Sequence, residues 1–117
     1  MPTLLRLYPG PRYSEASIHA GTIYLAGQVP TDTSRDIEGQ TREVLDMVER
    51  LLLEAGSDKC HILMAQLFLS DMADYEGMNK AWDQWVVAGS APPRATVQAQ
   101  LADPGWRIEL VVTAALP

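Results

Sequence analysis

The sequence predicts an α+β domain with elements in the order β-β-α-β-α-β-β, in which two helices cover one face of a sheet. Two stretches carry apolar residues at spacings of three and four, which indicates helices. Short alternating or continuous apolar stretches lie around them, and these indicate strands. The length of 117 residues and the absence of an internal repeat or linker predict one domain, residues 1–117.

The first two strands are expected at residues 17–20 and 22–26. Ala20-Gly21 forms the turn between them, because glycine accepts the positive φ that tight hairpin turns require. Pro30 then ends this region, since proline cannot donate a hydrogen bond to a strand ladder.

Residues 37–55 predict the first helix, with Asp36 as its N-cap and Gly56 just beyond its end. Residues 60–69 are nearly all apolar, which predicts a strand buried on both faces. Residues 74–87 predict the second helix.

Residues 96–101 predict the next strand, with Val97, Ala99 and Leu101 on one face. The Asp-Pro-Gly sequence at 103–105 is a turn signal, and residues 107–116 form the last strand.

The second face of this sheet also needs a cover. The strands at 60–69 and 107–116 are apolar on both faces, whereas two helices cover only one. Copies of the same chain in closed symmetry are the economical cover, because a large apolar patch would otherwise face water. The pattern does not set the number of copies.

The net charge is −6, so nucleic acid is a poor partner, since an acidic surface repels phosphate. A single cysteine, Cys60, fits a reducing compartment, and no apolar run reaches the length of a membrane span. We therefore expect a cytoplasmic protein with no membrane partner. The histidines and Cys60 lack metal-ligand spacing, so we expect no metal. No glycine-rich phosphate motif occurs, and we expect no cofactor.

Arg94 follows two prolines that fix the backbone between the second helix and a strand. Its planar fork suits a carboxylate, although a structural ion pair on the surface is an alternative. Glu109 lies in an apolar strand and points to solvent, to a partner or into a site. Antiparallel pairing across the 103–105 turn would bring it near Thr96, and so near Arg94.

Several other polar and aromatic residues have two interpretations. Tyr13 and Tyr24 are half-buried aromatics or site residues, and Asn79 lies on a helix surface or donates a hydrogen bond to a neighbouring loop. Trp82 and Trp85, at helical spacing, favour a core or interface position.

Four blocks of the sequence resemble the RidA/YjgF family, which includes RutC-like members. The last block is the most specific, because its arginine and glutamate recur at the family's spacing. The stretch at 78–89 is most similar to the YoaB-like branch. The matching blocks are 23–30 (IYLAGQVP), Gln40-Thr41 opening a helix that ends at 54–57 (EAGS), 69–79 (LSDMADYEGMN), and 92–97 (PPRATV) with 108–110 (IEL).

The resemblance implies a chorismate-mutase-like fold and a homotrimer with active sites between subunits. It also implies hydrolysis of reactive 2-imino acids, or their enamine tautomers, to 2-keto acids and ammonia without a cofactor. Arg94 would bind the substrate carboxylate and Glu109 would position or activate water. The substrate-binding set would be completed by Tyr13 from across the interface, the backbone of Thr96, Ala26 and Asn79.

Three positions depart from the family pattern: Ala26 replaces a common serine, Thr96 a common cysteine, and Arg12 a common proline. These changes affect the substrate more than the reaction type. A small-carboxylate-binding or regulatory trimer without turnover is the alternative function. Ribonuclease or translation inhibition is a third, against which the acidic charge and the lack of a basic stripe argue.

Overall fold

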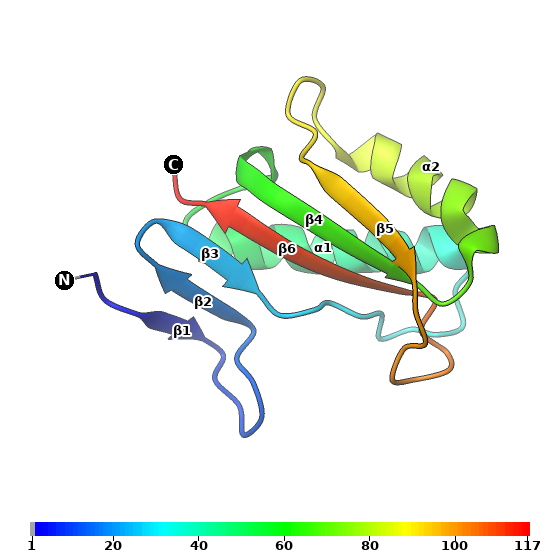
Figure 1. Ribbon diagram of the computed structural model, residues 1–117, viewed down its shortest axis with the longest axis horizontal. Coiled ribbons are helices and arrows are strands. Elements are labelled where there is room, and N and C mark those ends of the chain that lie inside the picture. The colour runs from blue at the N-terminus through cyan, green and yellow to red at the C-terminus, as the bar shows by residue number, and fades with distance from the viewer. Residues whose placement is uncertain (1) are drawn as a thin grey trace.

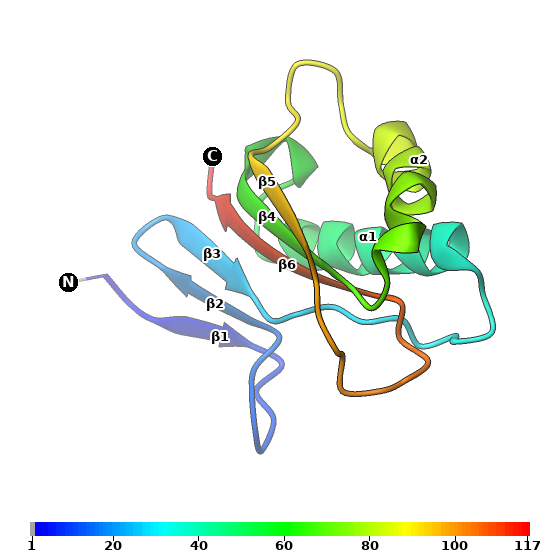
Figure 2. The ribbon, with the colours of Figure 1, turned by 45° about the vertical axis from the view of Figure 1, so that its right-hand side comes forward.

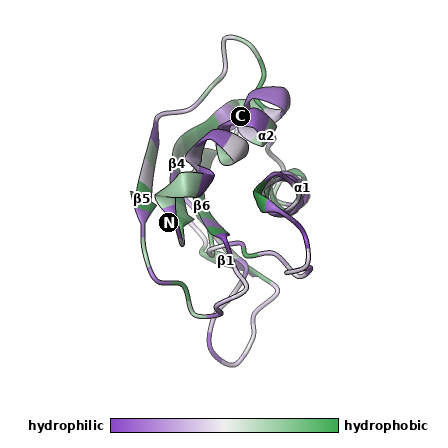
Figure 3. Ribbon diagram, turned by 90° about the vertical axis from the view of Figure 1, so that its right-hand side faces the viewer, coloured by the Kyte–Doolittle hydropathy of each residue, from purple (hydrophilic) through white to green (hydrophobic). Residues whose placement is uncertain are grey.

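A computed structural model describes residues 2–117 and contains one six-stranded sheet with two helices on one face (Figures 1 and 3). The strand order is β1-β2-β3-β6-β4-β5, in which β4 and β5 are parallel and the other neighbours are antiparallel. The α+β prediction is confirmed. The strands are β1 (Leu5–Leu7), β2 (Ala16–His19), β3 (Thr22–Leu25), β4 (Ile62–Leu69), β5 (Arg94–Gln98) and β6 (Ile108–Ala115).

The predicted hairpin is confirmed as β2 and β3. Ala20 and Gly21 form its turn with φ of 51° and 81°, the left-handed backbone that such a turn requires. The sequence analysis missed β1, which adds to the outer edge of β2 through Leu5–Leu7. A strand of three residues is too short to carry a readable alternation.

The first predicted helix is confirmed as α1 (Ile37–Glu54). The Asp36 side chain accepts a hydrogen bond from the Gly39 amide at 2.9 Å, which satisfies one of the free N–H groups of the first turn. Gly56 has φ of 94° directly after the helix, as expected for a C-terminal glycine. The buried face of α1 consists of Ile37, Gln40, Thr41, Val44, Leu45, Val48, Leu51 and Leu52.

The second predicted helix is confirmed as α2 (Tyr75–Trp85), which follows a short 3-10 turn, η2 (Met72–Asp74). Met78 and Trp82 are buried against the core. Gly77 permits a close crossing with α1, because a Cβ placed there would lie 2.5 Å from Cγ2 of Ile37.

The strand predicted at 60–69 begins two residues later. Asp58 caps a 3-10 turn, η1 (Lys59–His61), by accepting a hydrogen bond from the Cys60 amide at 2.8 Å. The prediction that this strand is buried on both faces is wrong for a single chain. Met64, on the side away from the helices, keeps 42% of its surface exposed.

One face of the sheet is therefore open. Along β6 the residues alternate between buried and half-buried, so every second side chain points away from the helices. Large apolar side chains are exposed on or beside this open face, among them Tyr24, Leu63, Met64 and Val97. In residues 2–117, neither helix is long and apolar enough to cross a membrane.

A buried glutamine ties α1 to the connection between β5 and β6. Gln40 is fully buried, and its Nε2 donates to the Arg35 and Gly105 carbonyl oxygens, both at 3.2 Å. Its Oε1 accepts from the Arg107 amide at 2.8 Å. One side chain therefore satisfies three backbone groups that water cannot reach easily.

We expect Gln40→Ala to lower the free energy of unfolding by about 2–4 kcal/mol, because a buried N–H loses its acceptor and a cavity remains. Denaturant unfolding at fixed protein concentration measures the change. Gln84→Ala, which alters an exposed glutamine on α2, is the matched control and should cost under about 1 kcal/mol. Equal losses in the two variants would contradict this role for Gln40.

Candidate functional site

Arg94 is the first residue of β5, at one edge of the sheet (Figure 2). The preceding proline keeps its carbonyl in the ladder, where the Pro93 oxygen accepts from the Ala65 amide at 3.0 Å. Arg94 pairs with Ala65, which is fully buried under the helices, so the Arg94 side chain lies on the helix-bearing side. The two prolines and the pairing with β4 fix the position of the Arg94 backbone, from which the side chain extends.

Helix α2 holds the guanidinium of Arg94 with neutral groups. Nη2 donates to Oδ1 of Asn79 at 2.8 Å and to the Tyr75 hydroxyl at 3.3 Å. Cζ lies 5.1 Å from the centre of a Trp82 ring and 5.9 Å from that of Tyr75, within range of cation–π attraction. These side chains lie on one side of α2, at spacings of three and four.

No carboxylate in residues 2–117 lies within ion-pair distance of Arg94, so its positive charge is not neutralised there. The alternative of a structural ion pair thus finds no partner within the described chain. A half-buried guanidinium with neutral partners keeps hydrogen-bonding capacity for an anion. We call this part of the molecule the arginine half-site. It consists of the side chains of Arg94, Tyr75, Asn79 and Trp82 and the backbone of Thr96.

The backbone of Thr96 faces the free edge of the sheet, whereas its side chain lies on the helix-bearing side. The Pro93 carbonyl and the Ala99 amide both bond to β4, so the odd-numbered residues of β5 face that strand and Thr96 faces the free edge. Its partner in register is Leu67, which is buried, so the Thr96 side chain lies on the helix-bearing side. The Thr96 Oγ1 is buried without a hydrogen-bond partner.

The predicted approach of Glu109 to Thr96 is wrong. Strand β4 lies between β5 and β6, so the strands on either side of the 103–105 turn do not pair. Glu109 pairs with Phe68, three residues beyond the Ala65 that pairs with Arg94. An odd separation on β4 places Glu109 on the open face, opposite Arg94.

Glu109 instead packs against Gly27. A Cβ built on Gly27 would lie 2.2 Å from Oε2 of Glu109, so any larger residue here would displace the Glu109 carboxylate from this position. Sequence reasoning did not identify the role of Gly27, although the Ala-Gly-Gln block that contains it was one of the matching motifs. The contact brings the Glu109 carboxylate beside the segment that follows β3.

Tyr13 and Ala26 line a hollow of about 420 Å³ on this part of the molecule, together with Tyr24. Tyr13 lies in the loop between β1 and β2 and keeps 65% of its surface exposed. Two contacts shape that loop: the Gly10 amide donates to the Tyr13 carbonyl at 2.9 Å, and the Tyr8 hydroxyl donates to Glu54 at 2.6 Å. The latter hydrogen bond raises the pKa of the Tyr8 phenol.

Tyr13, Ala26, Gly27 and Glu109 are called the tyrosine half-site. The structure brings Asn79 to Arg94 and places Ala26 next to the glycine that contacts Glu109, but one chain does not join the two half-sites. Tyr75 and Trp82 were missed as partners of Arg94. The helical spacing of Tyr75, Asn79 and Trp82 was the signal that could have revealed them.

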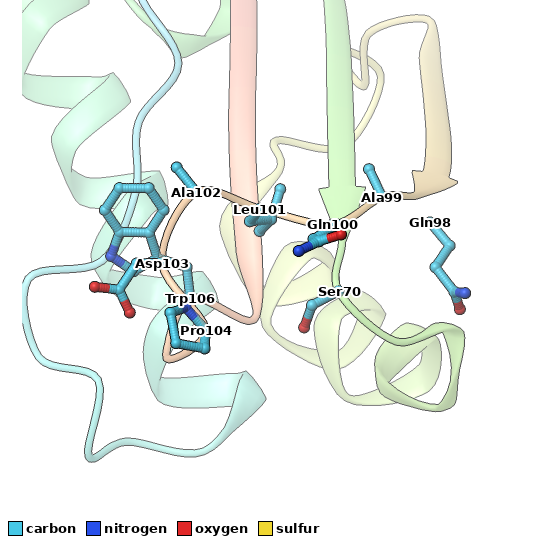
Figure 4. Close-up of a pocket in the computed structure, with 9 residues that line it drawn as sticks. All are labelled: Ser70, Gln98, Ala99, Gln100, Leu101, Ala102, Asp103, Pro104 and Trp106. Atoms are coloured by element: carbon cyan, nitrogen blue, oxygen red, sulfur yellow. The ribbon is translucent and has the colours of Figure 1, made fainter.

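A second hollow, of about 580 Å³, lies under the connection from β5 to β6 (Figure 4). It is lined by residues 98–104, with Trp106 and with Ser70 at the end of β4. None of the predicted site residues belongs to it. Within residues 2–117, no group of three or more His, Cys, Asp or Glu residues is placed to hold a metal ion.

Comparisons with known proteins cover almost the whole chain. The family model described as endoribonuclease L-PSP matches residues 3–116. The chain is 50% identical to a RutC family protein from Haemophilus influenzae over 113 residues, which are 96% of this chain and 97% of that protein. It is 43% identical to the RutC family protein YoaB from Escherichia coli over 114 residues, or 97% and 99% of the two chains.

Solved structures agree with these matches. A YjgF-family protein from Neisseria meningitidis superposes with a TM-score of 0.96 at 45% identity, covering 98% of this chain and 96% of that chain. YyfA of the Rid family, from Yersinia pestis, superposes with a TM-score of 0.84 at 28% identity, covering 92% and 90%. The resemblance stated from the sequence is confirmed: the chain belongs to the endoribonuclease L-PSP family, together with these RutC, YjgF and Rid proteins.

Proposed function

We propose that the protein is a homotrimeric deaminase that hydrolyses 2-imino acids, or their enamine tautomers, to 2-keto acids and ammonia in the cytoplasm. The observation that carries the proposal is the guanidinium of Arg94, half-buried and held only by neutral groups. Such a group binds a small carboxylate well, because both members of the new pair gain charge-assisted hydrogen bonds. The single cysteine favours a reducing compartment.

The two half-sites support a site between subunits. Arg94 lies on the helix-bearing side at the β5 edge, whereas Glu109 and Gly27 lie on the open face. Copies of the chain packed by their open faces in closed symmetry would cover the exposed Met64, Val97 and Tyr24 side chains. The same packing would set the arginine half-site of one subunit against the tyrosine half-site of the next.

In the assembled site, Arg94 holds the substrate carboxylate in its fork. The Thr96 backbone at the β5 edge adds a hydrogen bond, and Tyr13 covers the ligand from the adjoining subunit. The carbon of a protonated imine is already electrophilic, so the reaction needs no covalent intermediate with the protein. The main task of the site is to hold the imine and one water molecule in reacting positions.

Glu109 is the proton carrier. Its carboxylate accepts a proton from the attacking water as the oxygen–carbon bond forms and the C=N double bond becomes a single bond. It returns this proton to nitrogen. As the tetrahedral carbon expels ammonia, the carboxylate accepts the remaining hydroxyl proton, the carbonyl forms, and the departing ammonia takes up that proton. The products are one 2-keto acid and one ammonium ion, which together account for the protonated imine and the water.

We expect Arg94→Ala to lower kcat/KM for imines generated in situ by at least about 100-fold, because two charge-assisted hydrogen bonds to the substrate are lost. An amino-acid oxidase supplies the imine, and competition with semicarbazide measures how fast the protein removes it. Arg42→Ala is the control and should retain wild-type rates, because this exposed arginine of α1 contacts Gln84 of α2 and belongs to neither half-site. An Arg94→Ala protein as fast as the wild type would refute the assignment.

We expect Glu109→Gln to lower kcat by roughly 10²–10⁴-fold, the usual contribution of a positioned proton carrier, while a 2-keto acid still binds through Arg94. Calorimetric binding and turnover are compared in the same preparation. If the wild type binds keto acids without any imine turnover, the protein is the binding or regulatory trimer instead.

Mixed trimers test whether each site spans two subunits. Arg94→Ala and Glu109→Gln chains, denatured together and refolded at equal amounts, should recover up to about a quarter of wild-type activity, because that share of interfaces carries both intact residues. Either variant refolded alone is the control. No recovery from a mixture that assembles normally would place both residues in the same subunit's site.

A further inference from the structure

The hollow beside Tyr13 contains two arginines in addition to the tyrosine half-site. Arg6, on β1, and Arg12, in the loop between β1 and β2, both line this space of about 420 Å³. Ser14, Ser17, Tyr13 and Tyr24, which carry hydroxyl groups, line it as well. Two arginines and four hydroxyl-bearing residues therefore border one hollow.

The charges of these two arginines are not neutralised by the residues around them. Across residues 2–117, neither Arg6 nor Arg12 has a carboxylate within ion-pair distance. No aspartate or glutamate lines the hollow, although the chain carries six more acidic than basic residues. The Arg6 side chain donates a hydrogen bond to the neutral Ser17 hydroxyl. Two arginines without an ion-pair partner in one hollow favour the binding of an anion there.

We infer that Arg12, assisted by Arg6, binds a second carboxylate of the substrate, so that the preferred imines are 2-imino dicarboxylic acids of four or five carbons. The inference rests on the proposed function, because it takes the tyrosine half-site as one wall of the reaction site. The hollow contains Tyr13 and Ala26 of that half-site. A ligand whose first carboxylate lies on Arg94 from the adjoining subunit would extend its other end toward Arg12.

The proposed substrate length reflects the reach of the arginine side chain. Arg12 lies in an exposed loop, and its long side chain would meet a carboxylate one or two methylene groups beyond the reacting carbon. An aliphatic substrate side chain would gain less here, because it cannot accept hydrogen bonds from the two guanidiniums. Arg12 is thus a specificity-determining residue.

The test compares two classes of imine in the semicarbazide assay. An oxidase for acidic amino acids supplies imino dicarboxylates, and one for short neutral amino acids supplies imino monocarboxylates. We expect the wild type to favour the dicarboxylates in kcat/KM by about 10-fold to 100-fold, the effect of one charge-assisted pair. Arg12→Ala should bring this ratio close to one, and Arg12→Lys should restore part of it. Arg42→Ala should keep the wild-type ratio.

The ratio cancels any loss of folding or assembly, because both imines are then affected alike. A ratio near one in the wild type, or a ratio that Arg12→Ala leaves unchanged, would overturn the inference. If no imine of either class is hydrolysed, the proposed function fails, and calorimetry decides the subsite separately. A 2-keto dicarboxylate that binds at least about tenfold more tightly than a 2-keto monocarboxylate, only when Arg12 is present, would support it. Equal affinities would reject it.

Discussion

The candidate site depends on one set of contacts, in which side chains of helix α2 hold the guanidinium of Arg94 in place. A half-buried cation costs free energy, and a carboxylate partner would offset that cost by occupying the fork. Asn79 and Tyr75 instead satisfy only part of its donor capacity, at 2.8 and 3.3 Å, while the rings of Tyr75 and Trp82 lie against its π surface. The group is thus fixed in position and still has donors to offer. A salt bridge would fix the guanidinium at the cost of its affinity for a ligand.

The sheet imposes a second constraint. Because side chains alternate across a strand, Arg94 and Glu109 are on opposite faces whatever rotamers they adopt. A single chain cannot bring them together through side-chain motion. In the proposed trimer, a neighbouring copy of the chain would cover both the apolar surface on the Glu109 face and the free edge of β5 beside Arg94.

The sequence predicted the helices and strands more accurately than it predicted which strands lie next to one another in the sheet. Helix α1 was readable because its cap, its periodicity and its final glycine agree, and the β2–β3 hairpin because Ala20-Gly21 fits a single turn type. The pairing of β5 was misread, because a turn signal at 103–105 indicates that the chain reverses without saying which strand it meets. A parallel neighbour reached through a helix leaves no local signal, and β4 inserted between β5 and β6 separated the two residues expected to meet.

This geometry also bears on the departures from the family pattern. At residue 96 the backbone faces the open edge of β5 while the side chain turns toward the helices, so a change of side chain leaves the edge hydrogen bond available. At residue 26 the side chain lines the hollow itself, and alanine removes a hydroxyl from that wall. Arg12 also lines this hollow, and it places a positive charge at a position where a proline is common in the family. In the proposed reaction site, the β5 edge assigned to the first carboxylate is thus insensitive to these substitutions. The hollow assigned to the rest of the ligand instead gains a positive charge from Arg12, so under this proposal the substitutions alter substrate choice before they alter the reaction.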